Sequence, residues 1–333
     1  MSHLLLQPLA PANIYEPPSL LYTLLTQPLK TLIRLLDLLL TVFHTSPSVP
    51  STPLRIVCIS DTHCLTTSQI PDGDLLIHAG DLTNIGHPAE LQDQIDWLAS
   101  LPHENKIAIA GNHDRFLDPR SRKTLSFDDQ DDGFVNWKSI WYLQHSAVDL
   151  SFKNGRKLRV YGAPQTPADG QDDHAFRYAR GSDAWSGTVP SDVDVLVTHA
   201  PPKYHLDLPA ALGCEHLLAE VWRVRPRLHV FGHVHAGKTD YVGRLKRGRE
   251  VVRWDERQRC VEQARARSDG FVRGIVDPRG WLDIVKVLCY GGANVLWDRV
   301  WGGRSAESTT MVLASLMYCN SGELLNPPQV VEM

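Results

Sequence analysis

Five short apolar runs, each followed at once by side chains that commonly bind metals, constrain the fold of this 333-residue chain more than any other feature. The runs are apolar throughout rather than alternating, which is typical of buried parallel strands. They cover residues 55–60, 75–79, 107–110, 193–197 and 228–231. Ligands gather at the carboxyl ends of the strands in open α/β sheets, so we expect the five following segments to converge on one edge.

The segments after the runs are rich in Asp, His and Asn at short spacing. They are Asp61-Thr62-His63, Gly80-Asp81, Gly111-Asn112-His113-Asp114, Thr198-His199 and Gly232-His233-Val234-His235. Together they supply seven side chains that can bind metals through nitrogen or oxygen, and one further histidine. Imidazole, carboxylate and amide groups suit Mn, Fe, Zn or Ni better than Ca. The sequence therefore predicts a centre with two divalent metal ions.

A centre with two metals needs one ligand that reaches both ions, and a carboxylate with two oxygens can do so. We assign Asp81 as this bridge. Asp61, His63 and His235 then complete one ion, and Asn112, His199 and His233 complete the other. Two cations about 3.5–4 Å apart relieve the repulsion between phosphate oxygens and an attacking hydroxide, and they make hydroxide available near neutral pH. The predicted chemistry is hydrolysis of a phosphoester.

The eighth polar residue of the set, His113, is not needed as a ligand. It is free to contact the phosphate and to protonate the leaving alkoxide. Alternatively, it only supplies positive charge to the phosphoryl oxygens. Asp114 follows it in the chain, and we expect its carboxylate to orient the imidazole.

These motifs, taken together, resemble the calcineurin-like metallophosphoesterase superfamily. The stretches 72–83, 97–103 and 225–232, with Asn326-Pro327-Pro328 near the end, are similar to its metallophosphoesterase-domain-containing branch. The resemblance implies two stacked mixed sheets flanked by helices, and an activity on cyclic nucleotides or other small phosphodiesters. Some animal members have Gly at the position of His233, whereas this chain has a complete His233 and His235 pair. The superfamily also includes phosphomonoesterases, nucleases and non-catalytic scaffolds, so these remain alternatives.

Composition and charge narrow the choice of partners. The net charge of −4 argues against a dedicated nucleic-acid-binding protein, which is usually strongly basic. The six cysteines lack the spacing of zinc sites, and they are interpreted as reduced thiols of a cytoplasmic protein. The expected partner is a small phosphoester substrate.

Residues 1–52 form a separate segment in front of the expected phosphoesterase domain at 53–333. Residues 20–43 are rich in leucine, and polar residues recur every three or four positions, which predicts an amphipathic helix. Lys30, Arg34 and Asp37 interrupt the apolar span that a transmembrane helix would need. The helix could dock on the protein itself, self-associate with a second chain or lie peripherally on a membrane. Residues 46–53, with three prolines, are predicted to be a linker.

An insertion at about 238–308 separates the last histidine motif from the predicted closing strand. Its first part is rich in arginine, which is typical either of a helix face with Arg and Glu pairs or of a patch that attracts anions. Its second part is apolar and aromatic, and so long a segment must pack on something. The N-terminal helix is one candidate, and the two together could form a hydrophobic cap or a membrane-facing surface.

Overall fold

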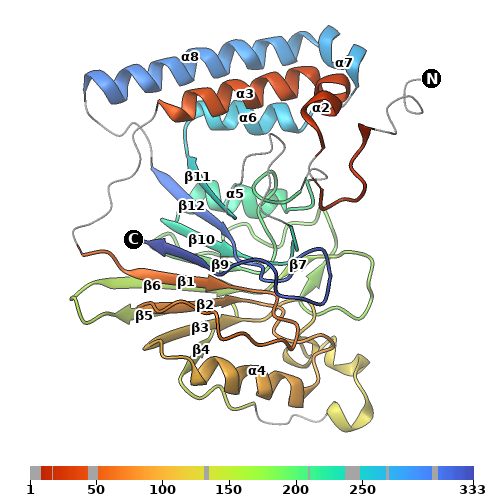
Figure 1. Cartoon of the computed structure of the whole chain (residues 1–333), viewed down its shortest axis with the longest axis vertical. Helices are drawn as coiled ribbons and strands as arrows, with labels where there is room; N and C mark the ends of the chain where they lie inside the picture. Colours follow the sequence, from red (N-terminus) through yellow and green to blue (C-terminus); the bar gives the residue numbers. More distant parts are fainter. Residues whose placement is uncertain are drawn as a thin grey trace. The chain divides into compact units, whose positions relative to one another are not determined.

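The computed structural model describes residues 9–16, 18–43, 52–130, 135–208, 211–236, 248–267, 270–301 and 307–333. The chain divides into two compact units (Figure 1). The sheet unit contains residues 49–238, 247–250 and 310–333. The helical unit contains residues 1–48, 239–246 and 251–309, so it combines the N-terminal segment with most of the insertion.

Two mixed sheets form the framework of the sheet unit. The first has the order β13-β1-β2-β3-β4, with β13 antiparallel to β1 and the other neighbours parallel. Its strands are β1 (Arg55–Ile59), β2 (Leu75–Ala79), β3 (Asn105–Ile109), β4 (Ile140–Tyr142) and β13 (Gln329–Glu332). The second has the order β11-β12-β10-β9-β6-β5. Its strands are β5 (Ser146–Ser151), β6 (Lys157–Ala163), β9 (Val195–Thr198), β10 (Leu228–Phe231), β11 (Arg249–Arg253) and β12 (Ser308–Leu313). The division into units counts residues 251–253 of β11 and 308–309 of β12 with the helical unit.

The largest apolar core lies between these two sheets and draws on strands of both. Along β1, Ile56 and Cys58 belong to this core, whereas Val57 and Ile59 belong to a second core on the opposite face of the strand. The second core is covered by α4 (Pro88–Ser100), which presents Leu91, Ile95 and Leu98 at helical spacing. Because β1 is buried on both faces, its sequence is apolar without alternation.

All five predicted runs overlap a strand, and the two at 75–79 and 228–231 match β2 and β10 residue for residue. The strands belong to two sheets rather than one: β1, β2 and β3 to the first, and β9 and β10 to the second.

The remaining elements of the sheet unit are short, apart from α5. They are β7 (Thr166–Pro167), β8 (Arg177–Tyr178), α5 (Glu215–Val224) and the 3-10 turns η2 (Arg115–Leu117), η3 (Arg122–Thr124) and η4 (Phe127–Asp129).

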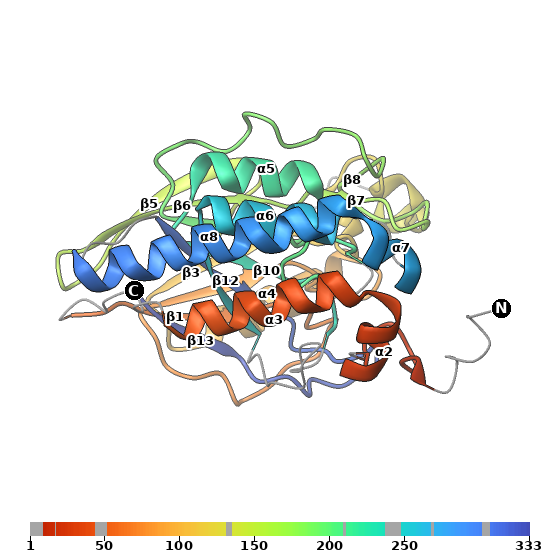
Figure 2. The ribbon, with the colours of Figure 1, turned by 90° about the horizontal axis from the view of Figure 1, so that it is seen from above.

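The described helices of the helical unit pack on one another, and α3 and α8 lie side by side (Figure 2). They are α2 (Leu20–Thr26), α3 (Pro28–Val42), α6 (Glu256–Arg265), α7 (Phe271–Val276) and α8 (Pro278–Val300). The predicted helix at 20–43 is therefore two helices, because Gln27 leaves the helical conformation and Pro28 begins the second one. Leu29 and Ile33 of α3 pack against residues of α6 and α8. The predicted linker at 46–53 lies largely outside the described residues, as does the start of the insertion up to residue 247.

Arginines of the insertion lie in ion pairs with acids of the same unit. Arg257, which is 3% exposed, contacts Asp37 of α3 at 2.7 Å. The guanidinium of Arg253 binds both carboxylate oxygens of Asp298, at 2.7 and 3.4 Å, and Arg267 binds Asp283 at 2.6 Å. These pairs fasten α3 and α8 to the arginine-rich segment.

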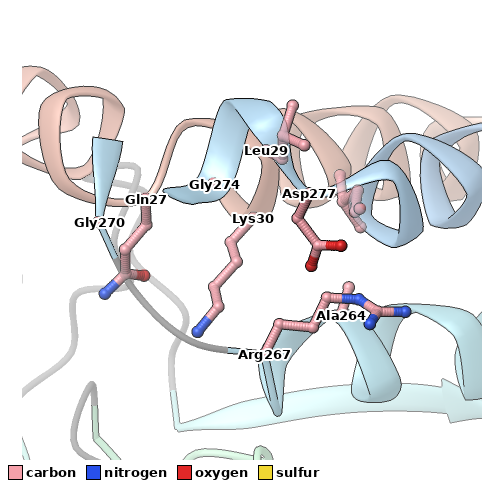
Figure 3. A pocket seen from close by; sticks show the side chains of 10 residues that line it. Gln27, Leu29, Lys30, Ala264, Arg267, Gly270, Gly274 and Asp277 are labelled. Carbon is pink, nitrogen blue, oxygen red and sulfur yellow. The ribbon is translucent and has the colours of Figure 1, made fainter. Parts of the chain in front are cut away.

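A small pocket opens among the helices of this unit, and Figure 3 shows the side chains of Lys30, Arg267 and Asp277 around it. Its volume of about 20 Å³ has room for about one water molecule, so it cannot hold a substrate. Within the described ranges, no helix combines the length and apolar character required to span a bilayer.

Candidate metal centre

The five motifs lie at the carboxyl ends of their strands, where the chain turns sharply. Asp61 follows β1, Asp81 follows β2 and Asn112 follows β3 in the first sheet, and His199 and His233 follow β9 and β10 in the second. The carboxyl ends of both sheets therefore contribute to one site.

The first cluster joins Asp61, His63, Asp81 and His235, whose donor atoms all lie within 4.8 Å of one another. Nε2 of His235 lies 3.2 Å from Oδ1 of Asp61 and 3.2 Å from Nε2 of His63. Nε2 of His63 lies 3.7 Å from Oδ2 of Asp81. Four donor atoms thus face a common point, in the pattern of a ligand set.

The second cluster joins Asp81 to His199 and His233, and Asn112 lies among them. Oδ2 of Asp81 lies 3.3 Å from Nε2 of His199. Oδ1 of Asn112 lies 2.9 Å from Nε2 of His199 and 2.8 Å from Nδ1 of His233. One oxygen of Asp81, Oδ2, therefore faces histidines of both clusters, while Oδ1 accepts the backbone N–H of His113 at 2.8 Å.

The electrostatics of the site favour a cation. Burial alone would raise the pKa of Asp81, but His199 and other imidazoles around it hold that pKa well below its usual range. Burial alone would lower the pKa of His199, but the carboxylate of Asp81 raises it to about 9. Buried carboxylates with nitrogen donors around them attract positive charge, and a divalent ion supplies it while displacing protons from the imidazoles. The donor set is nitrogen and oxygen only, so it fits the predicted Mn, Fe, Zn or Ni.

The backbone of the site is strained in a way that places the ligands. Asp61, His63, Asp81 and His233 all have positive φ, between 47° and 66°. Residues other than glycine rarely adopt this backbone conformation. It costs roughly 1–3 kcal/mol for each residue, and it tends to occur at functional sites. Four of the seven predicted ligands are therefore held in positions that a stable fold alone would not require.

Two glycines of the motifs are required because the backbone there passes very close to the carboxylates of predicted ligands. A Cβ at Gly232 would overlap the carboxylate of Asp61 and the hydroxyl of Ser60, and a Cβ at Gly111 would overlap the carboxylate of Asp81. The glycines let the backbone pass next to the carboxylates.

His113 is half-buried beside the first cluster, with its ring centroid 4.9 Å from that of His63. Its Nδ1 lies 2.6 Å from the backbone carbonyl of Asn84, which is the acceptor that fixes the ring. The prediction that Asp114 orients this imidazole is wrong. Asp114 is fully buried and accepts hydrogen bonds from the backbone N–H groups of three residues, namely Leu82, Thr83 and Gly111, so it holds the loops of the site instead.

Two functional candidates were missed at the sequence level, His174 and Asp169. Nδ1 of His174 lies 3.1 Å from Nδ2 of Asn112 and 2.9 Å from Oδ2 of Asp169. The His174 ring also lies 4.7 Å from the ring of His113. Both residues come from the connection between β7 and β8, which follows no apolar run, so no local pattern pointed to them. We expect them to position Asn112.

Two further histidines lie inside the strands, and each is hydrogen-bonded to a threonine of one of the motifs. Nε2 of His78 in β2 lies 3.0 Å from the hydroxyl of Thr62, and Nε2 of His229 in β10 lies 2.8 Å from the hydroxyl of Thr198. Each threonine directly precedes a predicted ligand. Burial lowers the pKa of both histidines to about 3, so they are neutral core residues in the folded protein.

Comparison with known proteins agrees with this geometry. The family model described as calcineurin-like phosphoesterase matches residues 54–237. This chain belongs to that family. It is 40% identical over 217 residues to metallophosphoesterase domain-containing protein 1 of Homo sapiens, an alignment that covers 58% of this chain and 64% of the relative. The Mus musculus protein of the same name gives the same values.

Another relative, from Emericella nidulans, bears the name "Probable rhamnogalacturonate lyase C". It is 46% identical over 239 residues, which are 71% of this chain but only 21% of that protein. The chain thus spans about a fifth to two thirds of the length of these relatives. Membership in the calcineurin-like phosphoesterase family, with the buried Asp and His clusters, supports a metal-dependent phosphoesterase.

Proposed function

We propose that the chain hydrolyses small phosphodiesters, of which cyclic nucleotides are one class, at a centre with two divalent metals. The observation that carries the proposal is that Oδ2 of Asp81 faces histidines of two adjacent clusters, His63 of the first and His199 of the second. Asp61, His63 and His235 would hold one ion, and Asn112, His199 and His233 the other. When bound, such ions neutralise phosphoryl charge and make hydroxide available near neutral pH.

The residues of the chain have separate tasks in this proposal. The Asn84 carbonyl accepts from Nδ1–H of His113, so Nε2 is the atom that reaches the substrate. A proton held there would pass to the leaving oxygen, a contribution of about 10²–10⁴ in rate. Asp114 keeps the loops of Asp81 and Asn112 in register through its backbone hydrogen bonds. Asp169 accepts from Nδ1–H of His174 and so holds this ring next to the amide of Asn112.

The preference for a diester is supported by the resemblance to the branch whose members are linked to cyclic nucleotides. The lyase name of the Emericella nidulans relative is not extended to this chain, because the shared part is 21% of that protein. A complete set of ligands with His113 beside it argues against a non-catalytic scaffold.

The test is hydrolysis of bis(p-nitrophenyl) phosphate and p-nitrophenyl phosphate by protein stripped of metal and reloaded with manganese. Asp81→Asn and His113→Ala should each lose about 10²-fold or more of the diester activity. Asp149→Asn and His216→Ala, at exposed and half-exposed positions away from the clusters, should keep it. Turnover of the monoester alone would redirect the search to phosphatase substrates, and no turnover with two metals bound would favour a scaffold.

A further inference from the structure

The helical unit exposes a long apolar stripe on α7 and α8. Monomeric soluble proteins rarely expose contiguous apolar patches larger than a few hundred Å². The stripe consists of Phe271, Val272, Ile275, Val276, Trp281, Leu282, Val285, Leu288, Tyr290, Leu296, Trp297, Val300 and Trp301, all of which are exposed. Val272 is 69% exposed and Trp301 is 63% exposed, so neither is a core residue at the edge of the unit.

Along α8, the exposed apolar residues cover the part of the helix surface that does not pack within the helical unit. Trp281, Val285, Leu288 and Leu296 recur at helical spacing on the exposed side. The opposite side, which includes Ile284 and Val287, packs against residues of α3 and α6. At 23 residues, α8 is about 34 Å long, and the apolar face follows this length.

The acidic and basic residues of α7 and α8 have different surroundings. The segment has three acids: Asp277 is half-buried, caps α8 and lines the small pocket, while Asp283 and Asp298 are buried in ion pairs with arginines of the unit. Four cations remain: Arg273, Arg279, Lys286 and Arg299. Within the part of the chain that the structure describes, none of the four has an ion pair. The exposed charged residues of α7 and α8 are therefore cations, and they lie among exposed apolar and aromatic side chains.

We propose that this face of α7 and α8 lies in the headgroup layer of a membrane that contains anionic lipid. Tryptophan and tyrosine prefer the boundary between hydrocarbon and water, and long cationic side chains reach from an apolar stripe to phosphate groups. Cations distributed along α8 from Arg279 to Arg299 require the helix to lie along the surface, as in interfacial amphipathic helices. This inference concerns the helical unit and does not depend on the proposed hydrolase activity.

A second copy of the chain fits this face less well. A two-fold contact would place the same patch on both subunits, so cations would meet cations with no exposed acid of the segment between them. An anionic lipid surface provides the complementary charge, worth about a factor of five in binding for each cation near it.

The experiment is cosedimentation of the full-length chain with vesicles of phosphatidylcholine, with and without phosphatidylserine. We expect binding to the anionic vesicles that weakens when salt rises from about 0.1 M to about 1 M, because the Debye length falls from about 10 Å to about 3 Å. A triple variant, Arg279→Glu, Lys286→Glu and Arg299→Glu, should bind at least about 100-fold more weakly, because it removes three cations and adds three charges that anionic lipid repels. The matched control reverses three exposed lysines of the sheet unit, Lys123, Lys153 and Lys157, and should bind far better than the triple variant.

A second variant separates the apolar contribution from the charge. Trp297 and Trp301 stack on each other at 4.9 Å and are exposed, so their replacement by Gln should leave the fold intact, which circular dichroism checks. Their loss should weaken binding to anionic vesicles by about 10-fold or more. Phe127→Gln, at a position 90% exposed in the sheet unit, is its control. Equal binding to both vesicle types, no binding to either, or a dimer in sedimentation equilibrium that the tryptophan variant dissociates would each overturn the proposal.

Discussion

Two buried aspartates of the candidate metal centre and two buried aspartates of the helical unit have different neighbours. In the sheet unit, Asp61 and Asp81 face imidazoles, whereas in the helical unit Asp283 and Asp298 face guanidinium groups. Imidazole has a lone pair that it can give to a metal, and guanidinium has none. The same kind of buried acid therefore forms part of a candidate metal centre in one unit and a closed ion pair in the other.

The distribution of histidine follows this division. Thirteen of the fifteen histidines belong to the sheet unit, and the other two, His3 and His44, lie outside the described residues. Among the described residues, both groups of candidate metal ligands lie in the sheet unit. Chemistry that depends on metals and protons is thus expected from one unit, and contact through an exposed face from the other.

The largest effect that would test this comparison is expected from Asp298→Asn. The variant removes the closer carboxylate of the largely buried Arg253 and leaves the more distant Asp255, at 3.7 Å, which should destabilise the helical unit by about 3 kcal/mol. Thermal unfolding with and without manganese measures it. The manganese-induced rise of the melting temperature should persist in Asp298→Asn and disappear in Asp81→Asn, because only Asp81 is a proposed ligand. If Asp298→Asn also abolished this rise of the melting temperature, the effect of manganese would not depend on the proposed ligands alone, and the contrast between the two kinds of buried acid would fail.

A smaller contrast comes from the same substitution at two glycines. Gly232→Ala should disturb the metal centre, since its Cβ would overlap Asp61 and Ser60, and we expect a loss of about 2 kcal/mol and reduced manganese binding. Gly292→Ala lies within α8, where a Cβ meets no atom within 4 Å. It should stabilise the helical unit by about 0.5–1 kcal/mol through helix propensity. Urea unfolding of both variants measures the change in the free energy of unfolding, which should be a loss for Gly232→Ala and a gain for Gly292→Ala. A gain for both would contradict the close approach at Gly232.

The sequence predicted the strands and the convergence of the motifs, because both depend on local patterns. Buried parallel strands require apolar runs, and the turns after β1, β2 and β10 place Asp61, Asp81 and His233 at positive φ, which Asp and His adopt more readily than most residues. The division of the strands between two sheets was less accessible, because it depends on pairing across long stretches of chain. The resemblance to a family, rather than the runs themselves, provided the two-sheet fold.

The errors within the site have a common cause. Asp114 was assigned to His113 because the two are adjacent in sequence, but the turn directs the carboxylate into the backbone of Leu82, Thr83 and Gly111. The carbonyl of Asn84 and the side chain of His174 reach the same site through loop paths that no periodicity encodes. In the helical unit, periodicity predicted a helix at 20–43, and the apolar part of the insertion was one candidate to pack on it; α8 does so together with α6, which comes from the arginine-rich part.

The smallest expected effect concerns pH, and it depends on the unequal distribution of histidine. Burial disfavours the charged form of His229 and lowers its pKa to about 3 in the folded protein, against about 6.5 for an exposed histidine. Between these values the unfolded chain binds a proton that the folded chain excludes, so the stabilising contribution is complete above pH 6.5 and is lost as pH falls. His229→Gln removes the titrating group and keeps a partner for the hydroxyl of Thr198. From about pH 6.5 to about pH 5.5, the free energy of unfolding of the wild-type chain should fall by about 1 kcal/mol relative to this variant, measured by urea unfolding of metal-free protein.

Asp298→Asn is the control from the helical unit. It should change the free energy of unfolding by the same amount at both pH values, because carboxylates and guanidinium groups keep their charge in this range. Parallel pH profiles for the wild type and His229→Gln would mean that this histidine is protonated inside the core, and the contrast between the units would then not extend to their response to acid.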